Sequence, residues 1–476
     1  MGEKEEGGSA VAIKAELNAR DQRYLDLSLN GPMWKVVLSI GAPLALYQWL
    51  AILFTILDTM MASHISKESV SAVAYLAQLQ LVLNAVGGGL AVGSGIQISR
   101  AYGERNLILV RKRVSTLYAI AFGVGLLMLL AILPFRVQFL RLAGTPEELI
   151  TVGVRYFSVQ LFVMVVTFLN NVYVAVERAR GNARRIFFLN LAVIVTKLSL
   201  TALFVYGLHG DLVMIAVATL LSQLLMLSFA LRFSFVGGSA FSFSPHAITF
   251  DKEVSSPMLR QSFPVIVEKA LFAAGKTVVN SMCSLYGPLM VGAMGVSNNL
   301  GGITTNPQNG FQEASSAIIS QNHGARKYRR VLQAFYTTAA INMILGAIIS
   351  MLELWQLNLL SGLFDGGSLE FRAMIAHVYR YEVWGAVPLG FNAAVMSLLY
   401  GLGYTRLTLL LNFSRVFVFR IPVFWYLQRF TDVGDAAVGM VMMISNISVA
   451  VLALLVAIPV VRHVRHLDAV MEKEGA

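Results

Sequence analysis

The sequence contains few charged residues, one cysteine and no nucleotide-binding loop. Charged residues make up 13% of the 476-residue chain, against about 25% in average soluble proteins. The single cysteine, Cys283, cannot form an internal disulfide, so it leaves the redox compartment open. No G-x-x-x-x-G-K-[S/T] motif occurs, which argues against direct use of ATP. Metal-binding histidine pairs, nucleophile elbows and paired catalytic acids are missing too, so neither an enzyme nor a cofactor is expected.

Long apolar segments dominate instead. Hydrophobic residues form 57% of the chain and the mean hydropathy is +0.68, so lipid is the solvent for most of the sequence. A helix needs about twenty apolar residues to cross a bilayer. The sequence therefore predicts an all-α membrane protein with twelve spans, at residues 34–61, 70–98, 114–134, 150–175, 186–206, 212–234, 259–284, 289–319, 331–359, 373–399, 407–429 and 436–461.

The two halves of the sequence repeat each other. GGGLAVGSGIQISRAYGERN and GFQEASSAIISQNHGARKYRR both end an apolar run in a glycine turn followed by basic residues. Matched landmarks lie 221 residues apart at Ser99 and Ser320, Gly103 and Gly324, and Pro43 and Pro264, and 222 apart at Asn190 and Asn412. Such a spacing predicts two homologous lobes of six helices each. The small residues at 87, 89, 91 and 93 predict a close helix–helix approach.

Basic residues predict the orientation. The net charge of +11 lies mostly in short loops, and the loops after spans 2, 4 and 8 are the rich ones. By the positive-inside rule we expect even-numbered loops and both termini in the cytoplasm, with the protein in the inner membrane and no nucleic-acid partner. The expected segments are an N-terminal tail (1–33), an N-lobe (34–234), a cytoplasmic linker (235–258), a C-lobe (259–461) and a C-terminal tail (462–476).

Three segments carry a resemblance to a known family. GAPLALYQWLAILFTILDTMMASHI, with Asp58 and Thr59, and the turns SRAYGERN and SQNHGARK are similar to the first span and to the turns after spans 2 and 8 of the MATE (multidrug and toxic compound extrusion) antiporters. The resemblance covers about residues 33 to 461. It implies a V-shaped pair of six-helix lobes, related by a pseudo-twofold axis along the membrane normal, that exposes a central cavity alternately to each side. ARGNARR lacks the aspartate and proline usual for the family there.

Ionisable residues within spans cost at least about 2.5–3.5 kcal/mol to insert, so they are functional candidates. In the N-lobe, the resemblance implies ion coupling by Asp58, although a helix-end acid at the membrane surface is an alternative. Lys197 and Thr201 fall where many prokaryotic relatives carry Asn and Asp. Because an ammonium cannot ligate Na⁺, we expect the N-lobe to work without bound Na⁺. Lys197 then pairs with Asp58, unless its side chain reaches the membrane surface.

The C-lobe contains more charge. Glu268, Lys269 and Lys276 form one broad polar strip on a single helix. The resemblance implies ion coupling by Glu268. The alternative is that Glu268 forms a local ion pair that only stabilises the C-lobe. Expected charge partners or substrate-binding residues also include Arg380, Glu382, Arg415 and Arg420.

Arg415 and Arg420 are five residues apart, which is about 140° around an α-helix, so at most one of them is expected to face a given target. Polar cavity-lining side chains are expected at Gln48, Thr201, Asn298, Asn306 and Asn309.

The expected function is a secondary antiporter for organic molecules, coupled to H⁺ rather than Na⁺, working as a monomer among membrane lipids. Six basic candidates (Lys197, Lys269, Lys276, Arg380, Arg415 and Arg420) face three acidic ones, Asp58, Glu268 and Glu382, so anionic or zwitterionic substrates are favoured. The alternative is a flippase for a lipid-linked or polysaccharide precursor, although such proteins often have fourteen spans. A channel fits two mobile half-repeats less well.

Overall fold

Long α-helices form nearly the whole of the described chain. The computed structural model describes residues 16–62, 67–235, 239–364 and 368–474, without the side chains of 52–75, 152 and 288. The N-lobe contains the spanning helices α2 (Met33–Ala62), α3 (Lys67–Gly103), α4 (Leu107–Ile132), α6 (Glu147–Ala179), α7 (Ala183–Ala202) and α8 (Leu212–Phe235), with the short α5 (Arg136–Leu142).

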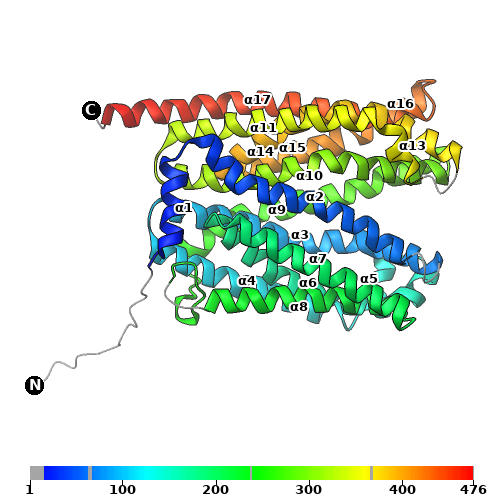
Figure 1. The fold of residues 1–476 in the computed structure, drawn as a ribbon, viewed down its shortest axis with the longest axis horizontal. Helices are drawn as coiled ribbons and strands as arrows, with labels where there is room; N and C mark the ends of the chain where they lie inside the picture. The colour runs from blue at the N-terminus through cyan, green and yellow to red at the C-terminus, as the bar shows by residue number, and fades with distance from the viewer. Residues whose placement is uncertain (1–15, 63–66, 236–238, 365–367, 475–476) are drawn as a thin grey trace, which may run out of the picture.

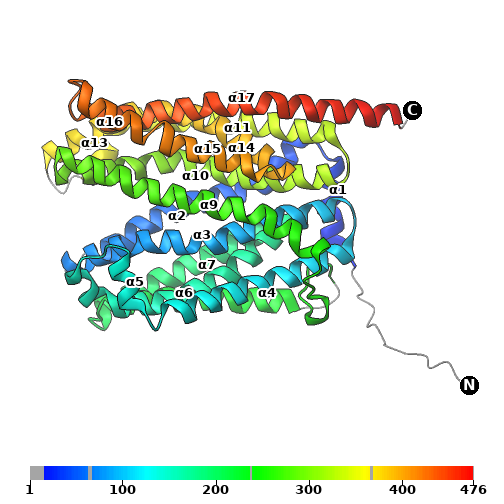
Figure 2. The same ribbon diagram turned by 180° about the vertical axis from the view of Figure 1, so that it is seen from behind.

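The C-lobe repeats this series of six spans. They are α9 (Lys252–Cys283), α10 (Pro288–Gly324), α11 (Tyr328–Trp355), the joined pair α13 (Leu369–Glu382) and α14 (Ala386–Leu402), the joined pair α15 (Thr405–Phe413) and α16 (Ile421–Phe430), and α17 (Ala436–Glu474), with the short α12 (Leu357–Gly362). Figures 1 and 2 show the two groups of helices lying side by side with their axes roughly aligned. The predicted arrangement of twelve spans in two lobes is confirmed in the described residues.

Two of the spans are unusually polar. Among the described residues, nine segments are long and apolar enough to cross a membrane. The helices α9 and α10 are not among these nine, because charged side chains interrupt the apolar sequence of α9 and amide side chains interrupt that of α10. Both helices therefore need a polar environment inside the protein.

The lobes meet through contacts that occur twice. A methyl group added to Gly89 of α3 would lie 2.7 Å from the backbone nitrogen of Ile266 in α9. At the equivalent place, 221 residues away for each partner, a methyl group on Gly310 of α10 would lie 2.5 Å from the backbone nitrogen of Ala45 in α2. Only glycine lets these helix backbones approach so closely, as the small-residue pattern predicts.

The repeated glycine turns also touch each other. A methyl group on Gly103 would meet the carbonyl oxygen of Gln321 at 1.9 Å, and one on Gly324 would meet that of Arg100 at 2.2 Å. The two turns therefore pack reciprocally at one end of the molecule, the end that carries α1 (Ala19–Asn30) (Figure 1).

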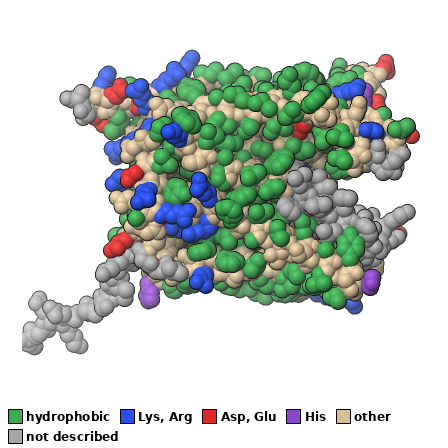
Figure 3. Space-filling view, in the orientation of Figure 1, with side chains coloured by type: hydrophobic (Ala, Val, Ile, Leu, Met, Phe, Trp, Pro, Cys, Tyr) green, Lys and Arg blue, Asp and Glu red, His purple; other side chains and the backbone are tan. Residues whose placement is uncertain are grey.

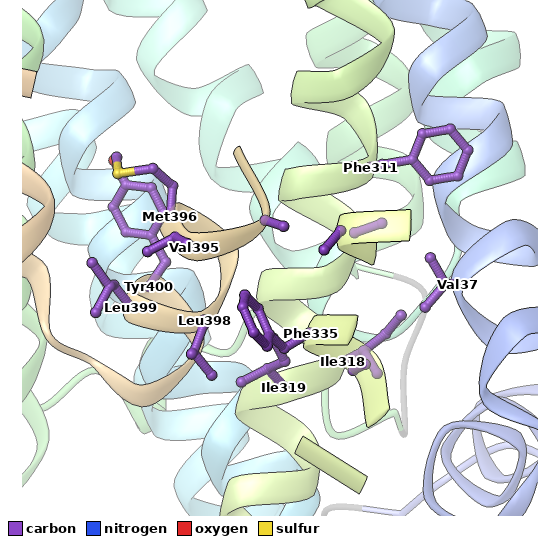
Figure 4. Close-up of a cluster of buried hydrophobic side chains, with 14 of the residues drawn as sticks. Val37, Phe311, Ile318, Ile319, Phe335, Val395, Met396, Leu398, Leu399 and Tyr400 are labelled. Carbon is purple, nitrogen blue, oxygen red and sulfur yellow. The ribbon is translucent and has the colours of Figure 1, made fainter. Parts of the chain in front are cut away.

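An apolar cluster joins α2 to the C-lobe. Figure 4 shows members of it from α2, α10, α11 and α14, among them Val37, Phe311, Ile318, Phe335 and Leu398. Since lipid is as apolar as this core, the cluster gains its stability from close packing rather than from exclusion of water. It also fixes the ring of Tyr400, which is 6% exposed.

The segment expected as an N-terminal tail contains a docked helix. Asp21 of α1 is buried and accepts hydrogen bonds from Nε and Nη2 of Arg180 in the N-lobe, at 2.9 to 3.0 Å. Burial lowers the pKa of Arg180, but the carboxylates of Glu177 and Asp21 outweigh it and raise that pKa above its usual value. The other end of α1 is held by the C-lobe, where Lys327 and Arg330 donate to the carbonyls of Leu29 and Ser28. Thus α1 crosses from one lobe to the other.

The opposite end of the chain also departs from the expected tail. The helix α17 continues through 462 to Glu474, so most of the predicted C-terminal tail is a helical extension of the last span. It projects at the same end of the molecule as α1 (Figures 1 and 2).

Candidate functional site

A cavity of about 670 Å³ lies between the lobes. The described part of its N-lobe wall is neutral and includes Gln48, Asn84, Gly88 and Asn171. Among the described lining residues, every charged side chain comes from the C-lobe: Glu268, Lys269, Lys276, Glu313, Glu382, Arg415 and Arg420. Figure 3 shows the lobes parted at the end away from α1. A cavity of this size suits a drug-sized molecule.

Ten of the predicted site residues line this cavity: Gln48, Glu268, Lys269, Lys276, Asn298, Asn306, Asn309, Glu382, Arg415 and Arg420. Arg380 does not, because it is exposed on α13. Lys197 is half-buried on α7 and Thr201 is buried there, both away from the lining. The side chain of Asp58 lies outside the described residues. Within the described lining, four basic groups face three acidic ones, so the expected excess of about three positive charges is reduced to one.

Glu268 of α9 is the most elaborately bound acid of the cavity. The side chain is 4% exposed. Tyr400 of α14 donates to Oε1 at 2.6 Å, Asn412 of α15 donates to the same oxygen at 2.7 Å, and Thr408 of α15 is 2.6 Å from Oε2. Two neighbouring helices, α14 and α15, thus fix the carboxyl group that α9 carries.

The partners of Glu268 were only partly visible in the sequence. Thr408 and Asn412 are four residues apart and therefore share a helix face, which is the signal that could have found them. Tyr400 had no such signal, since it lies in another helix and looks like an ordinary aromatic core residue. The apolar cluster of Figure 4 packs around the ring of Tyr400 and so holds its hydroxyl in position to donate to Glu268.

Arg415 and Arg420 converge, contrary to the prediction that at most one could face a given target. Both guanidinium groups donate to Oδ1 of Asn446, Arg415 at 2.8 and 3.2 Å and Arg420 at 3.1 Å. The prediction assumed a continuous α-helix. Instead, a π-turn (Ser414–Val418) separates α15 from α16, and the Phe419 amide donates to the carbonyl five residues back at 2.8 Å. A π-turn brings residues five apart onto one side, and such turns are frequent at functional sites.

The surroundings of these arginines are polar and aromatic. Arg420 is 2% exposed and also donates to Ser445. The ring of Phe272 in α9 has the Arg415 guanidinium 5.6 Å and the Lys276 ammonium 5.5 Å from its centre. Cation–π attraction stabilises both positions without neutralising the charge.

Glu382 stands at the joint between α13 and α14. It is 8% exposed, and Ser297 of α10 donates to its Oε2 at 2.5 Å. A methyl group at Gly301 would approach Oε1 to 3.1 Å, so glycine leaves room beside this oxygen.

An ion pair between the lobes borders the cavity toward α1. Arg178 of α6 lies 2.6 Å from Glu313 of α10. Lys269, Glu313 and Tyr400 line both the main cavity and a small space of about 60 Å³ beside it, which Arg178 also lines. Sequence reasoning missed this pair, because Arg178 lies near the end of α6, where charge is ordinary, and nothing in the sequence links it to Glu313.

A further acid, Glu353 of α11, was also missed. It is 3% exposed, receives hydrogen bonds from Thr304 at 2.7 Å and from Tyr379, and its Oε1 has no partner among the described residues. It does not line the cavity. A glutamate in the last two turns of the predicted span 331–359 resembles an interfacial residue in sequence.

Known proteins match the chain over most of its length. The sequence profile of one family, MatE, fits residues 43–203 and again residues 264–426. The chain belongs to the MatE family. Its two MatE units begin at Pro43 and Pro264, so the family unit occurs twice with the spacing of 221 residues that the sequence repeat predicts. The protein is therefore a multi-pass membrane protein of a family of transporters, not of enzymes.

Two proteins described as multidrug resistance or export proteins are similar in sequence to this chain. The probable multidrug resistance protein YoeA of Bacillus subtilis (strain 168) is 25% identical over 292 residues, which cover 60% of this chain and 63% of YoeA. The match thus spans less than two thirds of YoeA. The multidrug export protein MepA of Staphylococcus aureus (strain NCTC 8325 / PS 47) is 21% identical over 303 residues, 63% of this chain and 67% of MepA.

Among solved MatE structures, the outward-facing conformation of a multidrug resistance MATE family transporter of the MOP superfamily is similar to this chain. The TM-score is 0.89 at 19% identity, over 95% of this chain and 100% of that chain. At this identity the likeness establishes the fold, and substrate and coupling ion have to be argued from the residues of this cavity.

Proposed function

We propose that this protein is a secondary antiporter that exports a small organic molecule in exchange for H⁺, with Glu268 carrying the proton. The observation that carries the proposal is the hydrogen-bond arrangement around Glu268. Thr408 has one hydroxyl proton but two acceptors within reach, Oε2 of Glu268 at 2.6 Å and the carbonyl of Thr405 at 2.9 Å.

This arrangement suits both protonation states of the glutamate. When Glu268 is ionised, Tyr400, Asn412 and Thr408 all donate to it. When Oε2 carries a proton, that proton is donated to the Thr408 oxygen, and the Thr408 hydroxyl turns to the Thr405 carbonyl. Every donor keeps an acceptor in either state, so a proton is taken up or released with little movement.

Protons suit this site better than sodium ions. A sodium ion needs several free oxygen ligands, whereas both carboxylate oxygens of Glu268 already accept hydrogen bonds from side chains that two helices, α14 and α15, hold in place. For the N-lobe we keep the proposal that it contributes no Na⁺ site. The substrate is proposed to be anionic or zwitterionic, because basic groups outnumber acidic ones in the described lining.

We also propose an orientation. The end of the molecule that carries α1 holds the loops rich in Lys and Arg (Figure 3), and by the positive-inside rule it faces the cytoplasm. The reciprocal glycine turns and the Arg178–Glu313 pair then close the cytoplasmic side. In this state the cavity faces away from the cytoplasm, where exported substrate leaves and a proton enters.

The test is transport by purified protein in sealed proteoliposomes, with H⁺ and Na⁺ gradients imposed separately. A pH gradient alone is expected to drive movement of an organic dye, and a Na⁺ gradient alone is not. A matched pair of variants refines the test, since Glu268→Gln removes the proton carrier and Glu370→Gln removes an exposed acid of the same lobe. Strict dependence on Na⁺ contradicts H⁺ coupling, and movement of a labelled lipid without any gradient favours the flippase alternative.

A further inference from the structure

The charges of the C-lobe wall form two separate groups along α9. Glu268, with Tyr400, Thr408 and Asn412 bound to it, forms what we term the acidic pole. Lys276, Arg415 and Arg420 form the basic pole. Glu268, Phe272 and Lys276 are spaced at four-residue intervals and so share one face of α9. Eight residues of helix separate the poles by about 12 Å along the axis, at about 1.5 Å per residue.

The basic pole is short of negative charge. The arginines donate to Asn446 and Ser445, which are neutral, and three of their N–H groups converge on the single oxygen Oδ1 of Asn446. No carboxylate of the described residues lies within ion-pair distance of either guanidinium. Glu382, which also lines the cavity, interacts with Lys276, Arg415 and Arg420 at longer range, so one carboxylate stands against three cations. Buried cations that lack full charge compensation are costly. Guanidinium groups also present planar pairs of donors that match a carboxylate, phosphate or sulfonate. The geometry thus calls for an anionic group on the ligand.

Proton exchange places a second demand on the ligand. An anion bound near a carboxyl group favours the protonated form, so a purely anionic substrate and a proton promote each other's binding. Antiport requires the reverse, namely that substrate and proton exclude one another. A cationic group on the ligand competes with the proton for a carboxylate and supplies that exclusion. The other charged groups lining this part of the cavity are Lys269 on the same helix and Glu313 on α10.

We infer that the cavity binds a zwitterion with well-separated charges: its anionic group at Arg415 and Arg420, its cationic group at Glu268 in place of the proton, and its apolar body against Phe272. This inference rests on the proposed H⁺ antiport and names the substrate class for the same cavity. The separation of the poles selects charges on the order of 10 Å apart, so a free α-amino acid is too short to reach both. The cavity of about 670 Å³ has room for such a molecule.

Three matched dyes test the inference in detergent, where no gradient is needed. An aminoxanthene dye with a free carboxylate is a zwitterion, its methyl ester is a cation, and the hydroxyxanthene fluorescein is an anion of the same shape. Fluorescence anisotropy is expected to show the zwitterion binding about tenfold or more tighter than either relative. In weakly buffered solution the zwitterion is expected to release protons on binding, and fluorescein to take them up.

Variants separate the two poles. Lys276→Gln and Arg415→Gln are expected to remove the preference of the zwitterion over its ester, and Glu268→Gln to abolish proton release while fluorescein still binds. Arg380→Gln, on the exposed face of α13, is the matched control and changes neither result. Lys276 is exposed to the cavity and makes no hydrogen bond that folding needs, so Lys276→Gln stays informative if Arg415→Gln fails to fold.

The inference is overturned if the ester binds as tightly as the zwitterion, or if Lys276→Gln and a folded Arg415→Gln leave the ratio unchanged. The experiments distinguish failure of this inference from failure of the proposed H⁺ antiport. Proton-driven transport with no preference for the zwitterion refutes the inference alone. Tight, proton-releasing zwitterion binding without any gradient-driven transport supports the two poles and refutes antiport.

Discussion

The N-lobe and the C-lobe share a fold but differ in what they bring to the cavity. Pro43 and Pro264 begin the two MatE units, and four residues later the N-lobe has Tyr47 where the C-lobe has Glu268. The described N-lobe lining carries no charge, whereas the C-lobe lining carries seven charged side chains. Helix packing between the lobes stays symmetric while the chemistry is concentrated in one of them. The contacts between the lobes are thus repeated in both halves, whereas the described charges of the cavity come from the C-lobe alone.

The largest difference between the lobes is expected when the two equivalent residues, Glu268 and Tyr47, are each substituted. Glu268→Gln keeps the shape and most hydrogen bonds but cannot release a proton, so proton-driven dye uptake in proteoliposomes is expected to fall to that of protein-free vesicles. Binding of the dye in detergent persists. Tyr47→Phe, at the equivalent N-lobe position, is expected to keep most of the activity. Full coupled transport by Glu268→Gln would refute the assignment of Glu268.

The attachments of α1 to the two lobes are also unequal. The helix is tied to the N-lobe by the buried Asp21–Arg180 pair and to the C-lobe by hydrogen bonds such as Ser28 to Gln321. Asp21→Asn removes one of the two carboxylates that pair with the buried Arg180, while Glu177 remains at 2.9 Å. The expected loss is therefore below the roughly 3–5 kcal/mol of a buried pair that is broken completely. Asp26→Asn breaks an exposed pair with Arg105, worth about 1 kcal/mol or less. Thermal unfolding in detergent measures the stability of both variants. Equal losses of stability for Asp21→Asn and Asp26→Asn would contradict the burial argument.

Where the lobes are symmetric, equivalent substitutions should have equal effects. Gly103→Ala and Gly324→Ala each push a methyl group into a carbonyl oxygen of the other turn, and overpacking of this kind costs about 1–3 kcal/mol. Gly123→Ala and Gly295→Ala are matched controls in the two lobes, since nothing lies within 4 Å of either added methyl. Thermal unfolding should show two similar losses and two unchanged controls. A loss at only one of the two turns would mean that the closure is not reciprocal.

The smallest effect is expected at Glu353, an acid of the C-lobe that does not face the cavity. Its Oε1 lacks a partner, while Oε2 accepts from Thr304 and Tyr379. Glutamine retains the accepting oxygen, so Glu353→Gln should change the free energy of unfolding by about 1 kcal/mol or less and leave proton-driven transport intact. Loss of coupling in this variant would extend the ion-binding part of the C-lobe beyond the cavity.

Features with a long-range signature in the sequence were predicted well. Apolar segments mark spans because the bilayer demands a minimum length, and equal spacing of Pro43 with Pro264 and of Gly103 with Gly324 marks the repeat. Charged and amide residues in the middle of α9 and α10 point to a cavity, because lipid does not tolerate them. Lys276 and Asn309 were found by this argument, and it supported Glu268, which the family resemblance also indicated.

Features that depend on helix irregularity or helix ends were predicted poorly. The π-turn after α15 is set by packing against its neighbours rather than by a residue type, so the register of Arg415 and Arg420 was wrong. Arg380 lies three residues before a break between helices and points outward. The docking of α1 depends on Arg180, a partner 159 residues away from Asp21 that only the folded structure brings close.

The doubled contact at Gly89 and Gly310 makes the chain equivalent to a dimer whose two subunits happen to be covalently joined. In a true homodimer every substitution appears twice, so a glutamate at the position of Glu268 would be accompanied by a second one at the position of Tyr47. Two ionisable acids would then face one substrate. Joining the halves removes that obligation: the glycine contacts that close the molecule are still made twice, while the cavity side chains of the two halves are free to differ.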